Sequence, residues 1–229
     1  MTARTYVLIP GAGGEAWYWH RVVPLLSAAG HRVIAVDLPA ADPAAGLAEY
    51  ADCVCAAVPD ATGPLVLVGQ SLGAFTAPLV AARLPTNLLV LVNPMVPAPG
   101  ESFSQWWEAT GQKPAMVEHL AGLGLGRTIF DEVEDFFHDV PAPVRQAAMA
   151  AGEPEQSEGP LEQPWPLAGW PDVATAVIQS SDDRLFPVEF QRRVVRDRLG
   201  LGLDVVPGGH LVALSHPREL ADQLLSYRV

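Results

Sequence analysis

Residues 65–75 read LVLVGQSLGAF: an apolar run of strand length, a serine with glycines two residues to either side, and the start of a helical segment. The pattern G-x-S-x-G between a buried strand and a helix is typical of a nucleophile elbow, a turn so sharp that the serine adopts a strained backbone conformation. Gly69 and Gly73 fit this turn, because the positions beside the serine tolerate almost no side chain. We therefore predict that Ser71 is a nucleophile raised above a sheet.

Further apolar runs of strand length lie on both sides of this motif. The expected strands are residues 6–9, 32–37, 65–69, 88–93, 174–180 and 203–206, and the expected helices are 17–29, 44–58, 72–84, 188–199 and 217–227. Near-continuous runs of Val, Ile and Leu are typical of strands buried on both faces, as in a parallel sheet covered by helices. The alternation of strands and helices therefore predicts an α/β fold with a doubly wound, mostly parallel sheet.

One segment interrupts this alternation. The strand at 88–93 is followed by an insertion far longer than the dozen or so residues of a normal crossover, with aromatic residues of its own and Pro-rich sequence at both ends. We predict that residues 95–166 form a helical cap over a core made of residues 1–94 and 167–229. A disordered linker is the alternative for the acidic residues 152–166.

The composition excludes several classes of protein. Of the 229 residues, 49% are hydrophobic and 17% are charged, which is far from the composition of a disordered polyelectrolyte. The 26 acidic residues exceed the 14 basic ones, which gives a net charge of -12. Because such a surface repels phosphate backbones and anionic lipids, we expect neither nucleic acid nor a membrane as a partner. A homodimer is left open.

The cysteines and the first residues bear on the compartment. The chain has two cysteines, Cys53 and Cys55, which are too close together on an expected helix for a relaxed disulfide and too few for a zinc site. The apolar stretch that ends at Pro10 is too short for a signal peptide, and no run reaches the length of a membrane helix. We therefore expect a cytoplasmic protein without a bound metal ion.

A serine hydroxyl is a weak nucleophile, so it needs a base and a third group that orients the base. Of the six histidines, His210 is the one in a loop directly after a late expected strand. Asp183 follows the expected strand at 174–180, at the edge where sites of open α/β sheets gather, and its neighbour Asp182 is the alternative. We predict that His210 is the base and that Asp183 is the acid.

Other polar residues near strand and helix ends have simpler interpretations. His20 and His31 adjoin arginines and are expected to be solvated groups at helix ends, and His216 is expected to cap the last helix. Asp37 also ends an expected strand, but it precedes the serine in the chain. We expect its carboxylate to accept hydrogen bonds from turn amides.

Acyl transfer also requires backbone N–H donors aimed at the oxyanion that develops on the substrate. The first expected donor is the N–H of Leu72, and the second is the N–H of Ala12 in the glycine-rich loop PGAGG at residues 10–14. The loop could instead hold phosphate, but it lacks the third glycine of G-x-G-x-x-G, and Lys113 is the sole lysine of the chain. We therefore expect no cofactor.

With serine, aspartate and histidine in this order along the chain, the sequence resembles the α/β-hydrolase fold over nearly its whole length except the insertion. More narrowly, it resembles the methylesterase and hydroxynitrile lyase branch of small serine esterases. GAGGEAWYWHRVVPLLSAAGHRVIAVDLP (11–39) is similar to the beginning of that branch, and GGHLVALSHPRELADQLL (208–225) is similar to its end. The resemblance implies a Ser71–His210–Asp183 triad and no cofactor.

The sequence departs from this branch near the expected site. Many relatives have a histidine before the first glycine of the oxyanion loop, where this chain has Pro10. The lyases use a hydroxyl residue in that loop and a lysine directly after the catalytic histidine, and here these places hold Gly11 and Leu211. Because the cation that handles cyanide is missing, the resemblance favours hydrolysis over cyanohydrin cleavage.

These residues together predict a serine hydrolase that cleaves a carboxylic ester of a small, largely apolar substrate through an acyl-enzyme on Ser71. Candidate walls of the substrate pocket, each of which could equally pack in the core, are Trp17, Trp19, Phe75, Trp106, Trp107 and Phe186. A thioesterase acting on acyl-CoA or carrier-bound acyl groups is one alternative. A ligand-binding protein, or a lyase or cyclase that uses His210 as a base, is the other.

Overall fold

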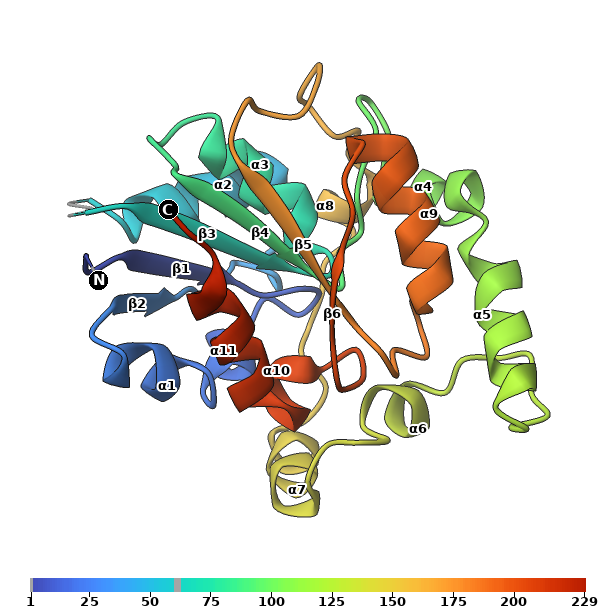
Figure 1. Ribbon diagram of the computed structural model, residues 1–229. Helices are drawn as coiled ribbons and strands as arrows, with labels where there is room; N and C mark the ends of the chain where they lie inside the picture. Colours follow the sequence, from blue (N-terminus) through green and yellow to red (C-terminus); the bar gives the residue numbers. More distant parts are fainter. Residues whose placement is uncertain (1, 60–62) are drawn as a thin grey trace.

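The structure, a computed structural model, describes residues 2–59 and 63–229. Its centre is a six-stranded sheet in which every pair is parallel and the strand order is β2-β1-β3-β4-β5-β6 (Figure 1). The strands are β1 Thr5–Ile9, β2 Arg32–Ala35, β3 Leu65–Gln70, β4 Leu88–Val92, β5 Thr175–Ser180 and β6 Asp204–Val206. Met1 and residues 60–62, which the predicted core segment 1–94 includes, lie outside the described residues.

Burial on both faces explains the apolar strand sequences. Every residue of β1, β3 and β4 is buried, and successive side chains alternate between two apolar layers. In β1, for example, Tyr6 and Leu8 join one layer, and Val7 and Ile9 join the other. The predicted parallel sheet, apolar on both faces, is confirmed.

Helices cover both faces of this sheet (Figure 1). One face packs against α2 (Leu47–Ala56), α3 (Gly73–Ala81) and α9 (Val188–Leu199). The other face packs against α1 (Val23–Ala28), α10 (Val212–Ser215) and α11 (Pro217–Ser226). The arrangement is the doubly wound one that the sequence predicted.

The helix predicted at 17–29 is divided in the structure. A 3-10 helix, η1 (Ala16–Trp19), comes first, and α1 begins only at Val23. Pro24 stands in the first turn of α1, where its missing N–H costs nothing, whereas inside a longer helix its ring would clash with the preceding turn. The proline therefore starts a new helix at this point.

The insertion between β4 and β5 is helical, as expected. Its helices are α4 (Phe103–Thr110), α5 (Gln112–Gly122), α6 (Glu132–Phe136), α7 (Ala142–Ala151) and α8 (Gly159–Glu162). Figure 1 shows α5 and α6 beyond one end of the sheet, and α7 below α10 and α11. No helix in the described part of the chain is long and apolar enough to cross a membrane.

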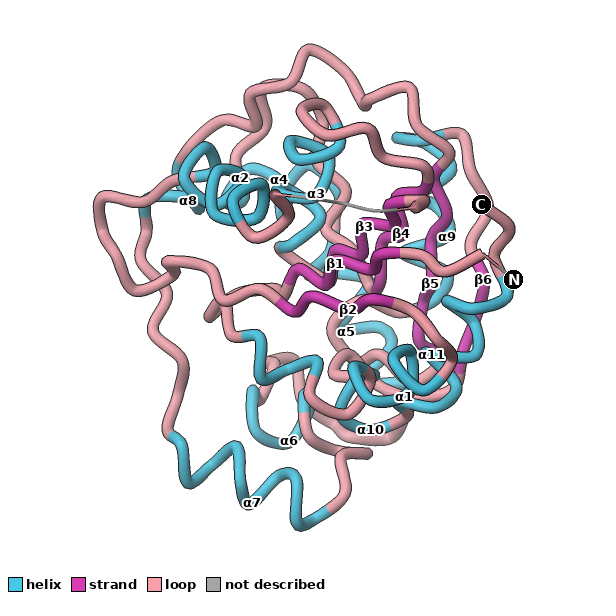
Figure 2. Tube along the Cα trace, turned by 90° about the vertical axis from the view of Figure 1, so that its left-hand side faces the viewer, coloured by secondary structure: helices cyan, strands magenta, loops and turns pink. Residues whose placement is uncertain are grey.

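The end of the insertion packs against the core. The chain between α7 and α8 is a loop, pink in Figure 2, and its Ser157 N–H donates a hydrogen bond to Ala40 O at 2.7 Å. After α8, Gln163 Oε1 accepts a hydrogen bond from Leu47 N–H at 3.0 Å. The alternative of a disordered linker at 152–166 is therefore wrong. Despite its acidic, Pro-rich composition, the segment forms hydrogen bonds with backbone groups of the core.

Candidate active site

The backbone around Ser71 has the geometry expected of a nucleophile elbow. Ser71 has φ = 51°, and among the described residues only Ser71 and Asn93 combine a side chain with a positive φ. A Cβ on Gly69 would lie 2.8 Å from Gly73 O, and a Cβ on Gly73 would lie 2.6 Å from Pro10 O. No side chain fits at these distances, so the turn requires both glycines.

Three side chains from distant parts of the chain meet at this turn. His210 Nε2 lies 3.1 Å from Ser71 Oγ, and His210 Nδ1 lies 2.8 Å from Asp183 Oδ2. The histidine is 3% exposed, and the aspartate is fully buried. The distances fit a neutral imidazole that donates its Nδ1–H to the carboxylate and accepts the serine hydroxyl at Nε2.

The loop after β5 fixes the carboxylate of Asp183. The N–H groups of Leu185 and Phe186 each donate to Asp183 Oδ1 at 2.9 Å, which leaves Oδ2 for His210. Asp182, the alternative from the sequence, is exposed and accepts a hydrogen bond from the hydroxyl of the preceding serine at 2.8 Å. The backbone therefore directs one of the adjacent carboxylates to the imidazole and leaves the other at the surface.

The sequence reasoning missed Asn93, which joins the elements around the site. Asn93 directly follows β4, is fully buried and has φ = 44°. Its Nδ2 donates to Ser180 Oγ at 2.9 Å and to His210 O at 3.0 Å, and its Oδ1 accepts from Ser180 N–H at 2.8 Å. An asparagine after a buried strand was the available signal, because asparagine tolerates positive φ better than most residues. Asn93 thus ties the ends of β4 and β5 to the loop that carries His210.

Gln70, directly before the serine, was missed as well. It is buried, and its Nε2 lies 3.3 Å from His210 Nε2 and 3.4 Å from His210 O. An amide nitrogen can only donate, so this contact favours an imidazole with a free lone pair at Nε2. That is the form in which a histidine accepts a proton from a hydroxyl.

Two phenylalanine rings enclose the imidazole. The ring centroids of Phe136, at the end of α6, and Phe186, in the loop after β5, each lie 5.2 Å from the imidazole centroid of His210. Phe186 was among the predicted pocket walls, whereas no motif marks Phe136 in the sequence. Because α6 belongs to the insertion, the insertion contacts the site directly.

A buried ion pair holds α6 in this place. The carboxylate of Asp135 is fully buried, accepts hydrogen bonds from both terminal nitrogens of Arg127 and lies 3.4 Å from a guanidinium nitrogen of Arg184. Burial acts to raise the pKa of Asp135, but hydrogen bonds from Arg127 and from the N–H of Asp131 outweigh it and hold the pKa below its usual value. The charged carboxylate therefore keeps α6 beside the loop that contains Asp183.

Several predicted pocket walls lie elsewhere. Trp19 is fully buried in the layer that contains α1 and α11, and Trp17 is 38% exposed and stacks on His20. Phe75 and Trp106 are fully buried in the layer on the opposite face of the sheet. The assignment of Trp17 and Trp19 as pocket walls is therefore wrong, because the short helix η1 directs one ring into the core and the other to the surface.

We expect Trp106→Ala to lower the free energy of unfolding by about 3–5 kcal/mol, because it removes a fully buried indole and leaves a cavity. The change also removes the hydrogen bond from Trp106 Nε1–H to Val96 O at 2.9 Å. The control is Trp17→Ala at an exposed position, for which we expect a loss below about 1 kcal/mol. Urea unfolding followed by circular dichroism measures both changes. Equal losses in the two variants would contradict the placement of Trp106 in the core.

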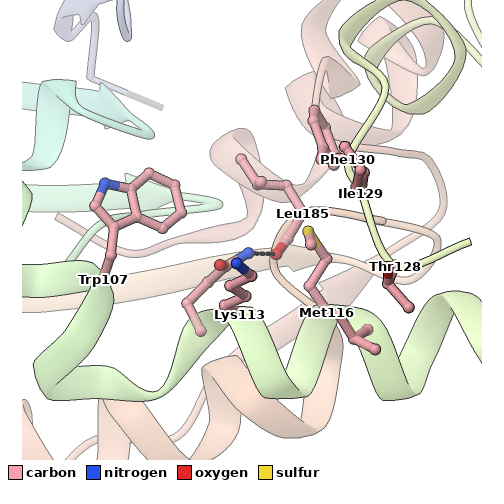
Figure 3. Close-up of a pocket in the computed structure, with 9 residues that line it drawn as sticks. Trp107, Lys113, Met116, Thr128, Ile129, Phe130 and Leu185 are labelled. Atoms are coloured by element: carbon pink, nitrogen blue, oxygen red, sulfur yellow. Dashed lines mark hydrogen bonds between the residues drawn. The ribbon is translucent and has the colours of Figure 1, made fainter.

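A cavity of about 530 Å³ lies between α4, α5 and residues 128–130 (Figure 3). Its apolar walls are Trp107, Met116, Val117, Ile129, Phe130 and Leu185, and Lys113 also lines it. Of the predicted pocket walls, Trp107 is the one found here. Leu185 lies both in this cavity and in the loop after β5 that holds Asp183, which we call the acid loop. Its N–H donates to Asp183, and its carbonyl accepts from Gln112 Nε2 at 2.6 Å.

The glycine-rich loop after β1 passes beside the serine. A Cβ on Gly11 would lie 3.0 Å from Ser71 Cβ and 2.5 Å from Gln70 Oε1. Among the hydrogen bonds of residues 2–59 and 63–229, none is donated by the N–H of Ala12 or the N–H of Leu72. The two predicted oxyanion donors therefore lie on the segments that flank Ser71, and neither is engaged by another protein group.

Of the four minor predictions, one is wrong and three are confirmed, among them the exposed position of His20. His31 is buried rather than solvated: its Nδ1 accepts from Arg4 N–H at 3.2 Å, and burial lowers its pKa. His216 is the N-cap residue of α11, as predicted: its carbonyl accepts from Leu220 N–H at 3.1 Å, although its side chain makes no capping hydrogen bond. Asp37 does bond a turn amide, since its Oδ1 accepts from Ala16 N–H at 2.7 Å.

Metal ligands and thiols are two further kinds of reactive group. In the part of the chain that the structure describes, no group of three or more His, Cys, Asp or Glu side chains is arranged to hold a metal ion. Cys53 and Cys55 are free thiols, and burial raises the pKa of each. A neutral thiol is a poor nucleophile, so these cysteines do not compete with Ser71.

Comparison with known families decides the classification. The sequence profile described as "Alpha/beta hydrolase family" matches residues 6–223. The chain belongs to the α/β hydrolase family. The resemblance stated from the sequence is thereby confirmed for the fold and the family.

Similar α/β hydrolases span nearly the whole chain. The probable esterase PIR7A of Oryza sativa subsp. indica is 28% identical over 96% of this chain and 95% of its own length. The pyrethroid hydrolase of Sphingobium wenxiniae is 27% identical over 99% of this chain and 88% of its own. The crystal structure of polyneuridine aldehyde esterase superposes with a TM-score of 0.71 at 23% identity and covers 98% of both chains. The insertion is thus part of the shared length, not an addition to it.

Proposed function

We propose that this α/β hydrolase cleaves carboxylic esters of small, largely apolar molecules through an acyl-enzyme on Ser71. The observation that carries the proposal is the imidazole of His210, which lies within hydrogen-bond distance of both Ser71 Oγ and Asp183 Oδ2. The relatives named esterase and pyrethroid hydrolase support an ester bond as the target.

The reaction has two halves. His210 Nε2 takes the hydroxyl proton as Ser71 Oγ attacks the acyl carbon, and the buried carboxylate of Asp183 stabilises the imidazolium. The oxyanion that forms accepts hydrogen bonds from the N–H of Ala12 and the N–H of Leu72. The proton then passes to the departing alcohol, and a water molecule activated by His210 releases the acid from Ser71.

The insertion, residues 95–166, acts as a cap in this proposal. Phe136 covers one side of the imidazole and so keeps water away from it. Because water is excluded, the hydrogen bonds within the triad are stronger. The apolar cavity between α4, α5 and residues 128–130 would take part of the substrate, since it reaches the acid loop at Leu185. The unbridged thiols Cys53 and Cys55 agree with a reducing compartment such as the cytoplasm.

A serine-directed fluorophosphonate tests the assignment of the nucleophile. We expect a single adduct in the intact mass, located on Ser71 by peptide mapping, together with complete loss of hydrolysis of short-chain p-nitrophenyl esters. Turnover that survives labelling, or an adduct on another residue, would refute the proposal. Faster turnover of acyl-CoA than of matched oxygen esters would move the substrate class to thioesters while leaving the acyl-enzyme intact.

A further inference from the structure

The oxyanion loop is held from the side opposite the serine by the insertion. The N–H of Gly13 donates a hydrogen bond to Gln156 Oε1 at 3.0 Å, although 143 positions separate the two residues. A Cβ on Gly13 would lie 2.5 Å from Pro154 Cβ, so the loop between α7 and α8 also packs against this backbone. A glycine with φ = 82° at this position leaves room for that close approach.

Gln156 is itself fixed to the core. Its Nε2 donates to Tyr50 Oη at 3.1 Å and to Ser157 O at 2.9 Å. Tyr50 is a buried residue of α2, and the N–H of Ser157 is bonded to Ala40 O at 2.7 Å. The acceptor for Gly13 is therefore placed by contacts with both the tyrosine and the segment after β2.

The loop thus contacts the rest of the protein at two points. On one side Gly11 is pressed against Ser71 and Gln70, and on the other side Gly13 is bonded to Gln156. Gly14 N–H closes the turn by donating to Gly11 O at 3.1 Å, so Ala12 sits between two anchored peptides. Anchoring both neighbours fixes the direction of the one N–H between them.

The group that accepts the hydrogen bond from Gly13, the side-chain amide of Gln156, is neutral although it lies in an acidic segment. Residues 152–163 contain glutamates at positions 153, 155, 158 and 162, yet a glutamine amide faces the loop. A carboxylate at this place would add a negative charge next to the position where an oxyanion develops and would oppose it. A neutral oxygen holds the loop without that penalty.

We infer that Gln156, a residue of the insertion, is a positioning residue for the oxyanion hole: it holds the loop so that the Ala12 N–H is directed at the oxyanion on Ser71. The inference rests on the proposed function. It couples the insertion to the chemical step, because displacement of the loop between α7 and α8 would also release the oxyanion loop.

The test compares Gln156→Met with Gln163→Met. Both glutamines belong to the end of the insertion, and each Oε1 accepts one core N–H at 3.0 Å, but Gln163 bonds Leu47 at the start of α2. For Gln156→Met we expect kcat on p-nitrophenyl esters to fall about tenfold with KM within about twofold, less than the loss of a whole oxyanion donor. For Gln163→Met we expect a similar fall in Tm and both constants within about twofold of wild type.

A second readout separates positioning from stability. A trifluoromethyl ketone, whose carbonyl carbon forms a bond with Ser Oγ and becomes a hemiketal oxyanion, should bind Gln156→Met about tenfold more weakly and Gln163→Met as tightly as wild type. If Gln156→Met does not fold, Gln156→Asn, whose amide is one methylene too short, serves the same comparison.

Failure of the inference is distinguishable from failure of the proposed function. Wild-type enzyme that gives no fluorophosphonate adduct on Ser71 would overturn the function. An adduct on Ser71, combined with wild-type kcat and wild-type ketone affinity in Gln156→Met, would overturn the inference alone. Equal losses in the two glutamine variants would do so as well, since they would report a structural role only.

Discussion

Replacement of Ser71 by alanine is expected to lower kcat for ester hydrolysis by at least about 10⁴-fold, because it removes the atom that forms the acyl-enzyme. The buried pair of His210 and Asp183 does not depend on the serine hydroxyl and should persist. Stopped assays with p-nitrophenyl esters, together with a circular dichroism spectrum, measure the effect. Appreciable turnover by this variant would indicate instead a lyase or cyclase in which His210 acts as a base.

The variant Ser71→Gly distinguishes the effect of residue 71 on backbone strain from its effect on catalysis. Ser71 has φ = 51°, a region that glycine enters without strain. We therefore expect Ser71→Gly to be as inactive as Ser71→Ala but to raise the free energy of unfolding by about 1 kcal/mol relative to it. A glycine variant no more stable than the alanine variant would show that the turn stores no such strain.

Asp183→Asn should lower kcat by about 10⁴-fold, the cost of the corresponding change in serine proteases. Leu185 and Phe186 donate to Oδ1, so an asparagine keeps its oxygen there and presents its NH₂ group to His210 Nδ1. The imidazole must then accept at Nδ1 and carry its proton on Nε2, where it can no longer accept the proton of Ser71.

Asp182→Asn is the matched control for this prediction. Asp182 lies beside Asp183 in the chain, but its side chain is exposed and accepts hydrogen bonds from Ser181 Oγ at 2.8 Å and from Gly208 N–H at 3.4 Å. We expect kcat within about threefold of wild type. The kcat and KM of both variants, measured at one pH, show which of the two aspartates is the acid that orients His210. A larger loss in Asp182→Asn than in Asp183→Asn would reverse the assignment of the acid.

The elbow could be predicted from the sequence because the strand, the turn and the helix that form it are consecutive in the chain. The contacts that require Gly69 are equally local, with Gly73 and Ala77, whereas a Cβ on Gly73 would clash with the distant residues Ile9 and Pro10. Helix boundaries were similarly local where the pattern was strong, as at 188–199, which the structure reproduces. Pro24 is a local signal as well: a proline marks the first turn of a helix, yet the helix predicted at 17–29 runs through it, whereas α1 begins at Val23.

The residues missed around the site share a different property. Asn93, Gln70, Phe136 and Gln156 act through contacts with parts of the chain far from their own positions. No motif marks such residues, because an amide or a phenyl ring has the same local sequence preferences whatever it later touches. The same holds for Trp17 and Trp19, whose surroundings depend on the layer that η1 joins.

The amino-acid sequence by itself determined the layered parallel sheet, the turn at Ser71 and the chain order of the three polar residues, because periodic burial and backbone sterics act over short stretches. Only the tertiary structure decided which insertion residues surround His210 and which side chain is hydrogen-bonded to the glycine-rich loop. These depend on how the ends of β3, β4, β5 and β6 and the returning insertion come together, and such long-range packing leaves no trace in the spacing of neighbouring residues.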